Sequence, residues 1–82
     1  MGVYKKSVKT VVVETLKKEI EQGRISESDL LNASYGRCQD IGLYITTLCN
    51  QSQQAVQYVR TETVQVYIRA YKRQLKNKSA KQ

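Results

Sequence analysis

Histidine, proline, phenylalanine and tryptophan are all missing from this sequence of 82 residues. Without histidine, the commonest general base and metal ligand is absent. The Ser/His/Asp and Cys/His arrangements of nucleophilic catalysis are excluded with it. The sequence also offers no pair of carboxylates suited to acid–base catalysis and no glycine-rich loop that would cradle phosphate. We therefore expect no catalytic residues, no metal site, no cofactor and no enzymatic activity.

Cysteine is scarce, with only Cys38 and Cys49 in the chain. On one continuous helix, their spacing of eleven positions places them about 16 Å apart along the axis. A disulfide needs Cα atoms within about 7 Å of each other, so an intrachain bridge is not expected. Two thiols without histidine make no zinc site. The pattern favours buried, reduced thiols that act as small apolar side chains, with a disulfide between subunits as the alternative.

Long hydrophobic runs are also missing. No segment approaches the ~20 apolar residues that span a bilayer. The first six residues lack the apolar stretch of a signal peptide, and Lys6 stands where myristoylation requires serine or threonine. We expect a cytoplasmic, intracellular protein for which a membrane is not the partner.

The charge of the chain is unevenly distributed. Fourteen basic and seven acidic side chains give a net charge of +7. Residues 1–10 carry three lysines, residues 63–82 carry six basic side chains, and neither segment contains an acid. Such clustering favours a polyanionic partner, either nucleic acid or an anionic membrane surface. The alternative is that the charge serves solubility alone.

Apolar residues at every fourth position predict a first helix over residues 7–22. Ser7 is a suitable N-cap, and Gly23 is a suitable residue just past the C-terminus. The run 11–13 has strand propensity, but the four-residue period outweighs it. The periodic positions are Val8, Val12, Leu16 and Ile20.

A second, long helix is predicted over residues 27–59, with Ser26 as its N-cap. Its apolar positions recur at alternating spacings of three and four, which is the pattern of a heptad seam. Asn50 leaves a break open, in which case Ser52 would cap a new helix. Gly42 lies off the seam and either allows another backbone near it or marks a bend. The seam comprises Leu31, Ser34, Cys38, Ile41, Ile45, Leu48, Ser52, Ala55 and Val59.

The predicted central helix is longer than its neighbours can cover, so we expect a second copy of the chain to pack on it. The predicted fold is all-α: a short helix, a long central helix and a short basic amphipathic helix in one domain over residues 1–76, paired as a dimeric helical bundle. The residues expected at the dimer or partner interface are Leu31, Cys38, Ile41, Leu43, Ile45, Leu48 and Val59.

The third predicted helix, over residues 63–76, is amphipathic. Its apolar residues fall within about 100° of arc, and its basic residues project from the other side. A strand would split those basic residues between two faces. Tyr67 and Tyr71 lie on the apolar side and are expected in the core. Residues 77–82 are expected to form a flexible basic tail.

The basic residues predict the function. Repeated cations on one helical stripe suit the phosphates of nucleic acid better than a single base contact. We therefore expect a small nucleic-acid-binding protein, regulatory or architectural, with DNA or RNA left open. The alternative is a helical adaptor or inhibitor that binds a protein through exposed Leu43, Tyr44 and Tyr58. The candidate nucleic-acid-binding residues are Lys5, Lys6, Lys9, Arg69, Lys72, Arg73, Lys76 and Lys78.

Overall fold

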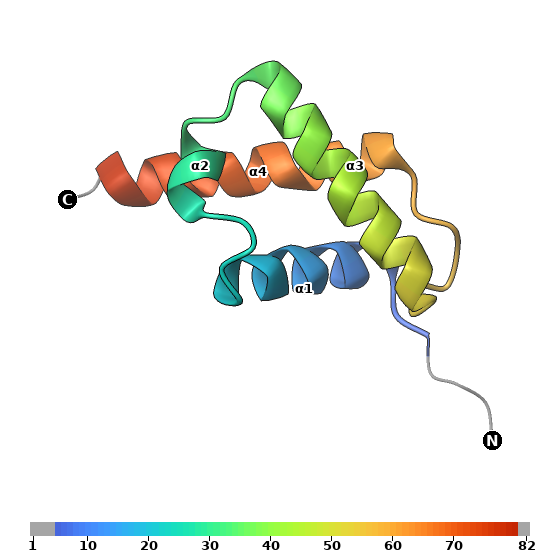
Figure 1. The fold of residues 1–82 in the computed structure, drawn as a ribbon. Coiled ribbons are helices and arrows are strands. Elements are labelled where there is room, and N and C mark those ends of the chain that lie inside the picture. Colours follow the sequence, from blue (N-terminus) through green and yellow to red (C-terminus); the bar gives the residue numbers. More distant parts are fainter. Residues whose placement is uncertain (1–4, 81–82) are drawn as a thin grey trace.

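The described residues form four helices. The computed structural model describes residues 5–80, with side chains as far as Lys78, so parts of the predicted domain and tail (1–4 and 81–82) lie outside the described residues. Apart from one isolated bridge between Lys6 and Ala55, the described residues form no β-structure. Figure 1 shows α3 crossing α4, with α1 packed beside both and α2 against α4. The all-α prediction is confirmed. The helices are α1 (Val8–Glu21), α2 (Glu27–Leu31), α3 (Tyr35–Ser52) and α4 (Thr61–Ala80).

Helix α1 begins and ends within one residue of the prediction. The Ser7 hydroxyl accepts a hydrogen bond from the Thr10 backbone N–H at 3.2 Å, which satisfies an N–H group of the first turn. At the other end, Gly23 adopts φ 81°. This left-handed conformation is open to glycine at no steric cost, so it ends the helix where the sequence indicates.

The long central helix is a wrong prediction, because the chain breaks after Leu31. Helix α2 has only five residues, and Ser34 is the N-cap of α3, where its hydroxyl accepts from the Arg37 N–H at 3.2 Å. A serine side chain that bonds to nearby backbone competes with helical hydrogen bonding. In the heptad pattern Ser34 counts as a seam residue, whereas its hydroxyl starts a new helix.

The second interruption follows α3, near the position left open at Asn50. Helix α3 ends at Ser52, and Gln53 adopts a left-handed φ of 56°. The Asn50 side chain accepts from the Val59 N–H at 2.9 Å and donates to the Val59 carbonyl at 3.0 Å. This pair of bonds holds the loop 53–60 against α3, so the chain reverses into α4. Ser52 does not cap a new helix there.

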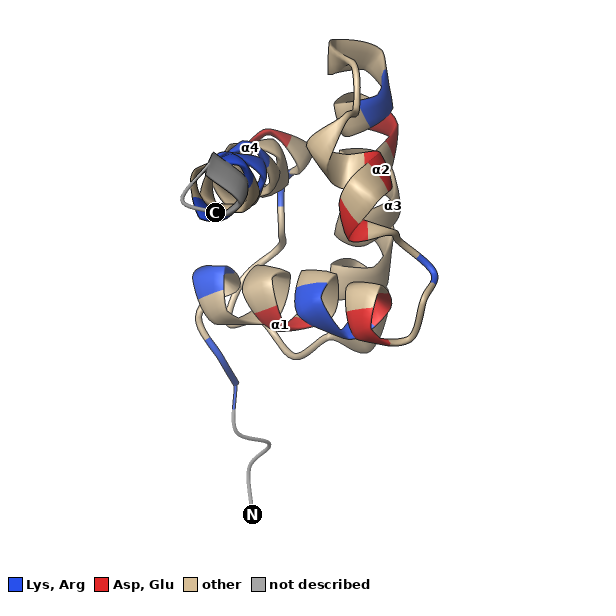
Figure 2. Cartoon of the chain, turned by 90° about the vertical axis from the view of Figure 1, so that its left-hand side faces the viewer, with Lys and Arg blue, Asp and Glu red and all other residues tan. Residues whose placement is uncertain are grey.

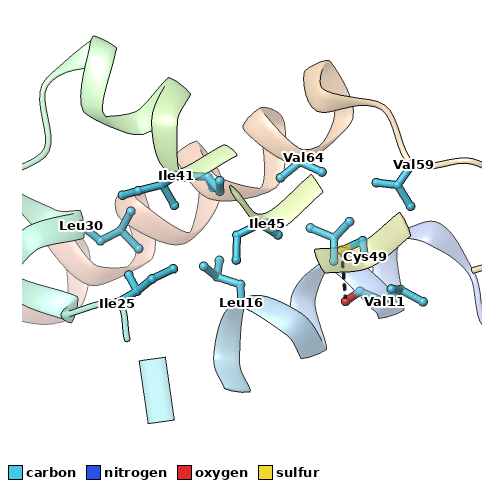
Figure 3. Close-up of a cluster of buried hydrophobic side chains, with 11 residues drawn as sticks. Val11, Leu16, Ile25, Leu30, Ile41, Ile45, Cys49, Val59 and Val64 are labelled. Carbon is cyan, nitrogen blue, oxygen red and sulfur yellow. Dashed lines mark hydrogen bonds between the residues drawn. The ribbon is translucent and has the colours of Figure 1, made fainter. Parts of the chain in front are cut away.

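One apolar core unites the four helices, and Figure 3 shows its side chains meeting between them. Four of the seven predicted interface residues are instead buried within the chain: Cys38, Ile41, Ile45 and Val59. Leu31 and Leu48 are half-buried, and Leu43 is exposed. An overlong helix was the reason to expect a dimer. Because the chain folds back on itself at both breaks, that reason does not hold.

Gly42 lies close to side chains of α4, rather than to another backbone as one prediction had it. A Cβ at this position would lie 2.9 Å from Cγ of Gln65 in α4 and 3.7 Å from Cδ1 of Ile68. Gly36, in the first turn of the same helix, has no neighbour within 4 Å of such a Cβ. The absence of a side chain at Gly42 therefore lets Gln65 and Ile68 of α4 pack closely against α3.

Replacing Gly42 with leucine should destabilise the protein by about 1–3 kcal/mol, the usual cost of overpacking. The matched control is Gly36→Leu, which makes the same substitution in the same helix but meets open space. It should be neutral, or stabilising by up to about 1 kcal/mol through helix propensity. Urea denaturation followed by circular dichroism measures both. Equal stability of the two variants would contradict the close packing at Gly42.

Both cysteines are free and buried, as predicted. The Cys49 thiol lies 4.0 Å from the Val11 carbonyl oxygen, and burial raises the pKa of this thiol. A raised pKa leaves less thiolate, so Cys49 is a poor nucleophile. The two thiols serve as small apolar groups in the core.

Candidate nucleic-acid interface

The position of α4 is set by its apolar side. Val64 and Ile68 are fully buried, and Tyr67, Tyr71 and Leu75 pack half-buried on the core. The amphipathic helix and the core role of both tyrosines are therefore confirmed. Helix α4 is longer than predicted, with 20 residues that begin at Thr61 and continue to Ala80. Residues 77–80, expected in a flexible tail, are thus helical.

Three cations occupy the outer surface of α4. Arg69, Arg73 and Lys76 are all exposed, and their spacing places them within about 60° of arc on the helix. The ion pairs among the described residues involve Lys6 and Arg24, and leave these three without an acidic partner. Figure 2, which views α4 from its C-terminal end, shows several basic positions along this helix. We refer to Arg69, Arg73 and Lys76 as the basic face.

Two cations predicted for this stripe are placed elsewhere. Lys72 is half-buried, and its Nζ donates to the Ala33 carbonyl at 2.5 Å. Lys72 thereby ties the connection between α2 and α3 to α4, which is a structural role. Lys78 follows Arg69 by nine residues, which in a continuous helix is about two and a half turns. Because α4 remains helical there, Lys78 lies on the opposite side of the helix from Arg69.

The N-terminal lysines do not join the basic face. Lys5 Nζ donates to the Gln53 carbonyl at 2.5 Å, and Lys6 forms an ion pair with Glu14 at 2.9 Å. Two backbone hydrogen bonds of 2.8 Å also join Lys6 to the loop 53–60. Lys9 is exposed on the first turn of α1. Figure 1 places this N-terminal segment at the opposite end of the molecule from the last turns of α4.

An open hollow lies where the loop 53–60 enters α4, and sequence reasoning missed it. Its volume is about 550 Å³. Sequence analysis assigned Tyr58 to the surplus apolar surface of a long helix, whereas the structure places it in a loop, with Val59 buried beside it. The signal available in the sequence was Arg60, a cation two residues after the aromatic Tyr58. We call this feature the Tyr58 hollow, and its lining residues are Val8, Gln57, Tyr58, Arg60, Thr63 and Tyr67.

A buried carboxylate was also missed. Glu19 is 4% exposed, and it accepts hydrogen bonds from the Arg24 guanidinium at 2.7 and 2.9 Å and from the Tyr44 hydroxyl at 2.6 Å. The hydrogen bonds from Arg24 lower the Glu19 pKa to about 2, against the opposing effect of burial, and the Tyr44 bond lowers it further. The cluster joins the end of α1 to α3. It is fully paired and therefore structural.

Two further classes of site have no support in the described part of the chain. No group of three or more acidic, cysteine or histidine side chains there is arranged to hold a metal ion. None of the helices in the same part combines the length and the apolar character needed to cross a membrane. Comparison of the chain with protein-family models, with curated proteins and with solved structures found no match.

Proposed function

We propose that this protein binds nucleic acid through the basic face of α4. The observation that carries the proposal is the orientation of the helix. Its apolar side is held in the core, so Arg69, Arg73 and Lys76 face outward with no acidic partner among the described residues. Cations arranged in this way neutralise phosphates and release counterions, which drives binding without base recognition.

The dimensions of the basic face suit a phosphate backbone. Arg69 and Lys76 are seven residues apart, which is about 10 Å along the helix axis. One strand of duplex DNA carries a phosphate about every 3.4 Å of its axis, so the three cations can engage neighbouring phosphates. Because α4 is already folded and packed, little ordering is required on binding, which favours affinity.

The test is the salt dependence of binding. Fluorescence anisotropy with labelled duplex DNA, duplex RNA and single strands should show binding at about 50 mM salt that weakens steeply by about 200 mM. The probe that binds most tightly identifies whether the protein's regulatory or architectural partner is DNA or RNA, and whether it is double- or single-stranded. Failure to bind every probe at low salt would refute the proposal and assign the basic face to solubility.

A second candidate function is the docking of a protein on the surface between α3 and the loop 53–60. Leu43 is 55% exposed and lines, with Thr47 and Tyr58, an open depression of about 480 Å³. Exposed apolar residues beside such a depression are typical of a docking surface.

The variant Leu43→Asp tests this second function. Affinity capture from nuclease-treated lysate should recover one stoichiometric protein with the wild type and lose it with the variant. Tyr44 must stay unchanged in this test, because its hydroxyl donates to Glu19 and its loss would disturb the fold. Equal capture by wild type and variant, or capture that depends on nucleic acid, would refute the second function.

A further inference from the structure

We propose that the Tyr58 hollow binds an unpaired nucleic-acid base, with the Tyr58 ring as its stacking surface. This inference rests on the proposed function and specifies the substrate as a strand that contains unpaired bases. The hollow has the chemistry that such a base requires: an aromatic face, a cation, an amide and a hydroxyl. Tyr58, Arg60, Gln57 and Thr63 supply them in that order.

Tyr58 is the most exposed of the large hydrophobic side chains among the described residues, at 75%. Its backbone is nonetheless held in place. The next residue, Val59, is fully buried, and both its N–H and its carbonyl are bonded to the Asn50 side chain. The ring is therefore carried by a fixed segment and faces solvent. Such preorganisation reduces the ordering cost of a ligand that stacks on it.

Three other tyrosines already have partners within the protein, in the core or through a hydroxyl hydrogen bond. Tyr67 and Tyr71 pack on the core, and the Tyr71 hydroxyl lies 3.4 Å from the Glu27 carboxylate. The Tyr44 hydroxyl donates to Glu19. Tyr58 has no hydrogen-bond partner among the described residues, and only one edge of the Tyr58 hollow, at Tyr67 and Val8, adjoins the core. Its ring is free to stack with a ligand.

Two cations line the hollows that Tyr58 borders. Arg60 lines the Tyr58 hollow, and Lys5 lines an adjoining hollow of about 400 Å³ that also includes Gln57 and Tyr58. A strand that stacks on Tyr58 would thus meet the Arg60 guanidinium, whereas the Lys5 ammonium already donates to the Gln53 carbonyl. Aromatic rings flanked by cations are the usual means of binding single strands, and the stacking is worth about tenfold or more in affinity per base.

The Tyr58 hollow and the basic face are distinct surfaces of α4. Tyr67 precedes Arg69 by two residues, and this spacing places them about 200° apart around the helix. A paired base in a duplex has both faces covered by its neighbours, so it is not free to stack on Tyr58. The Tyr58 hollow therefore discriminates unpaired from paired bases, whereas the basic face attracts both.

The test uses the full chain and a single strand that carries 2-aminopurine, whose fluorescence is quenched by stacking. Tyr58→Ala should weaken single-strand binding about tenfold, abolish the quenching and leave duplex binding unchanged. Tyr58→Phe, which keeps the ring, should retain both properties. Tyr35→Ala is the matched control, because Tyr35 is also exposed, at 69%, but starts α3 at a distance from the loop 53–60 (Figure 1).

The outcomes separate this inference from the proposed function. If the wild type binds both probes and Tyr58→Ala behaves like the wild type, the unpaired-base site is refuted and binding through the basic face stands. An equal loss of duplex and single-strand binding in Tyr58→Ala also refutes it, since stacking cannot act on a paired base. If the wild type binds no probe at low salt, both proposals fail.

Discussion

Replacing Arg69 and Arg73 together with glutamine should weaken nucleic-acid binding about a hundredfold near 50 mM salt. Each lost phosphate contact removes about 0.9 from the slope of log affinity against log salt for duplex DNA, which is about tenfold in affinity at that salt. Both side chains are exposed and unpaired among the described residues, so their loss removes binding contacts without disturbing the core. Anisotropy titrations at several salt concentrations measure the affinity and the slope.

The matched control is the pair Lys17→Gln and Lys18→Gln on α1, where both side chains are exposed. Both double variants lower the net charge of +7 by the same two units. If the basic face is the binding surface, the control should lose only a small part of the affinity. Equal losses in the two double variants would show that total charge, rather than the basic face, drives binding. Circular dichroism should show unchanged helicity in both.

Replacing Glu19 with glutamine should cost about 3 kcal/mol of stability. The carboxylate is buried. It accepts two hydrogen bonds from the Arg24 guanidinium and one from the Tyr44 hydroxyl. Glutamine keeps the size but loses the charge and one acceptor, and partners left unsatisfied in a buried site are expensive. Urea denaturation at neutral pH measures the loss. The control Glu14→Gln breaks the surface ion pair with Lys6 and should cost less than about 1 kcal/mol.

The same carboxylate should make stability depend on pH. The Glu19 pKa is about 2 in the folded protein, below its ordinary value of 4.5, chiefly because of the hydrogen bonds from Arg24. Between these values the unfolded chain binds a proton that the folded chain does not. The stabilisation is therefore complete above pH 4.5 and is lost as the pH falls towards 2. The stability difference between wild type and Glu19→Gln should shrink over that range, and a constant difference would contradict this assignment.

The helical breaks show where periodicity misleads. Spacings of three and four ran through Ser34 and Ser52 without interruption, because a heptad pattern counts positions and ignores what a side chain bonds to. At Ser34 the hydroxyl bonds to the Arg37 N–H and starts a new helix. At Asn50 the amide bonds to Val59, nine residues ahead. The Ser34 bond is a local N-cap that the heptad pattern overrode, whereas the Asn50 bonds join residues nine positions apart and leave no mark in a periodic pattern.

The breaks also changed the interpretation of the surface. A continuous helix would present Cys38, Ile41 and Ile45 to a second copy of the chain. With the chain reversed at both ends of α3, Ile41 and Ile45 instead join the core cluster with residues of α1 and α4, and Cys38 is buried within the chain. Tyr58, read as part of a helix face, belongs to a loop fixed by Asn50, which places it beside Arg60 at an open hollow.

By itself the sequence determined the helical class, the bounds of α1, the buried cysteines and the division of α4 into an apolar and a basic side. These features depend on residues within a few positions of one another, so capping and periodicity express them directly. Tertiary structure decided which cations are free. Lys72 donates a hydrogen bond to the Ala33 carbonyl, 39 residues away in the sequence. Lys78 lies on the side of α4 opposite Arg69, because the helix continues through Ala80. It also decided that Glu19 is buried, since its partner Tyr44 comes from another helix.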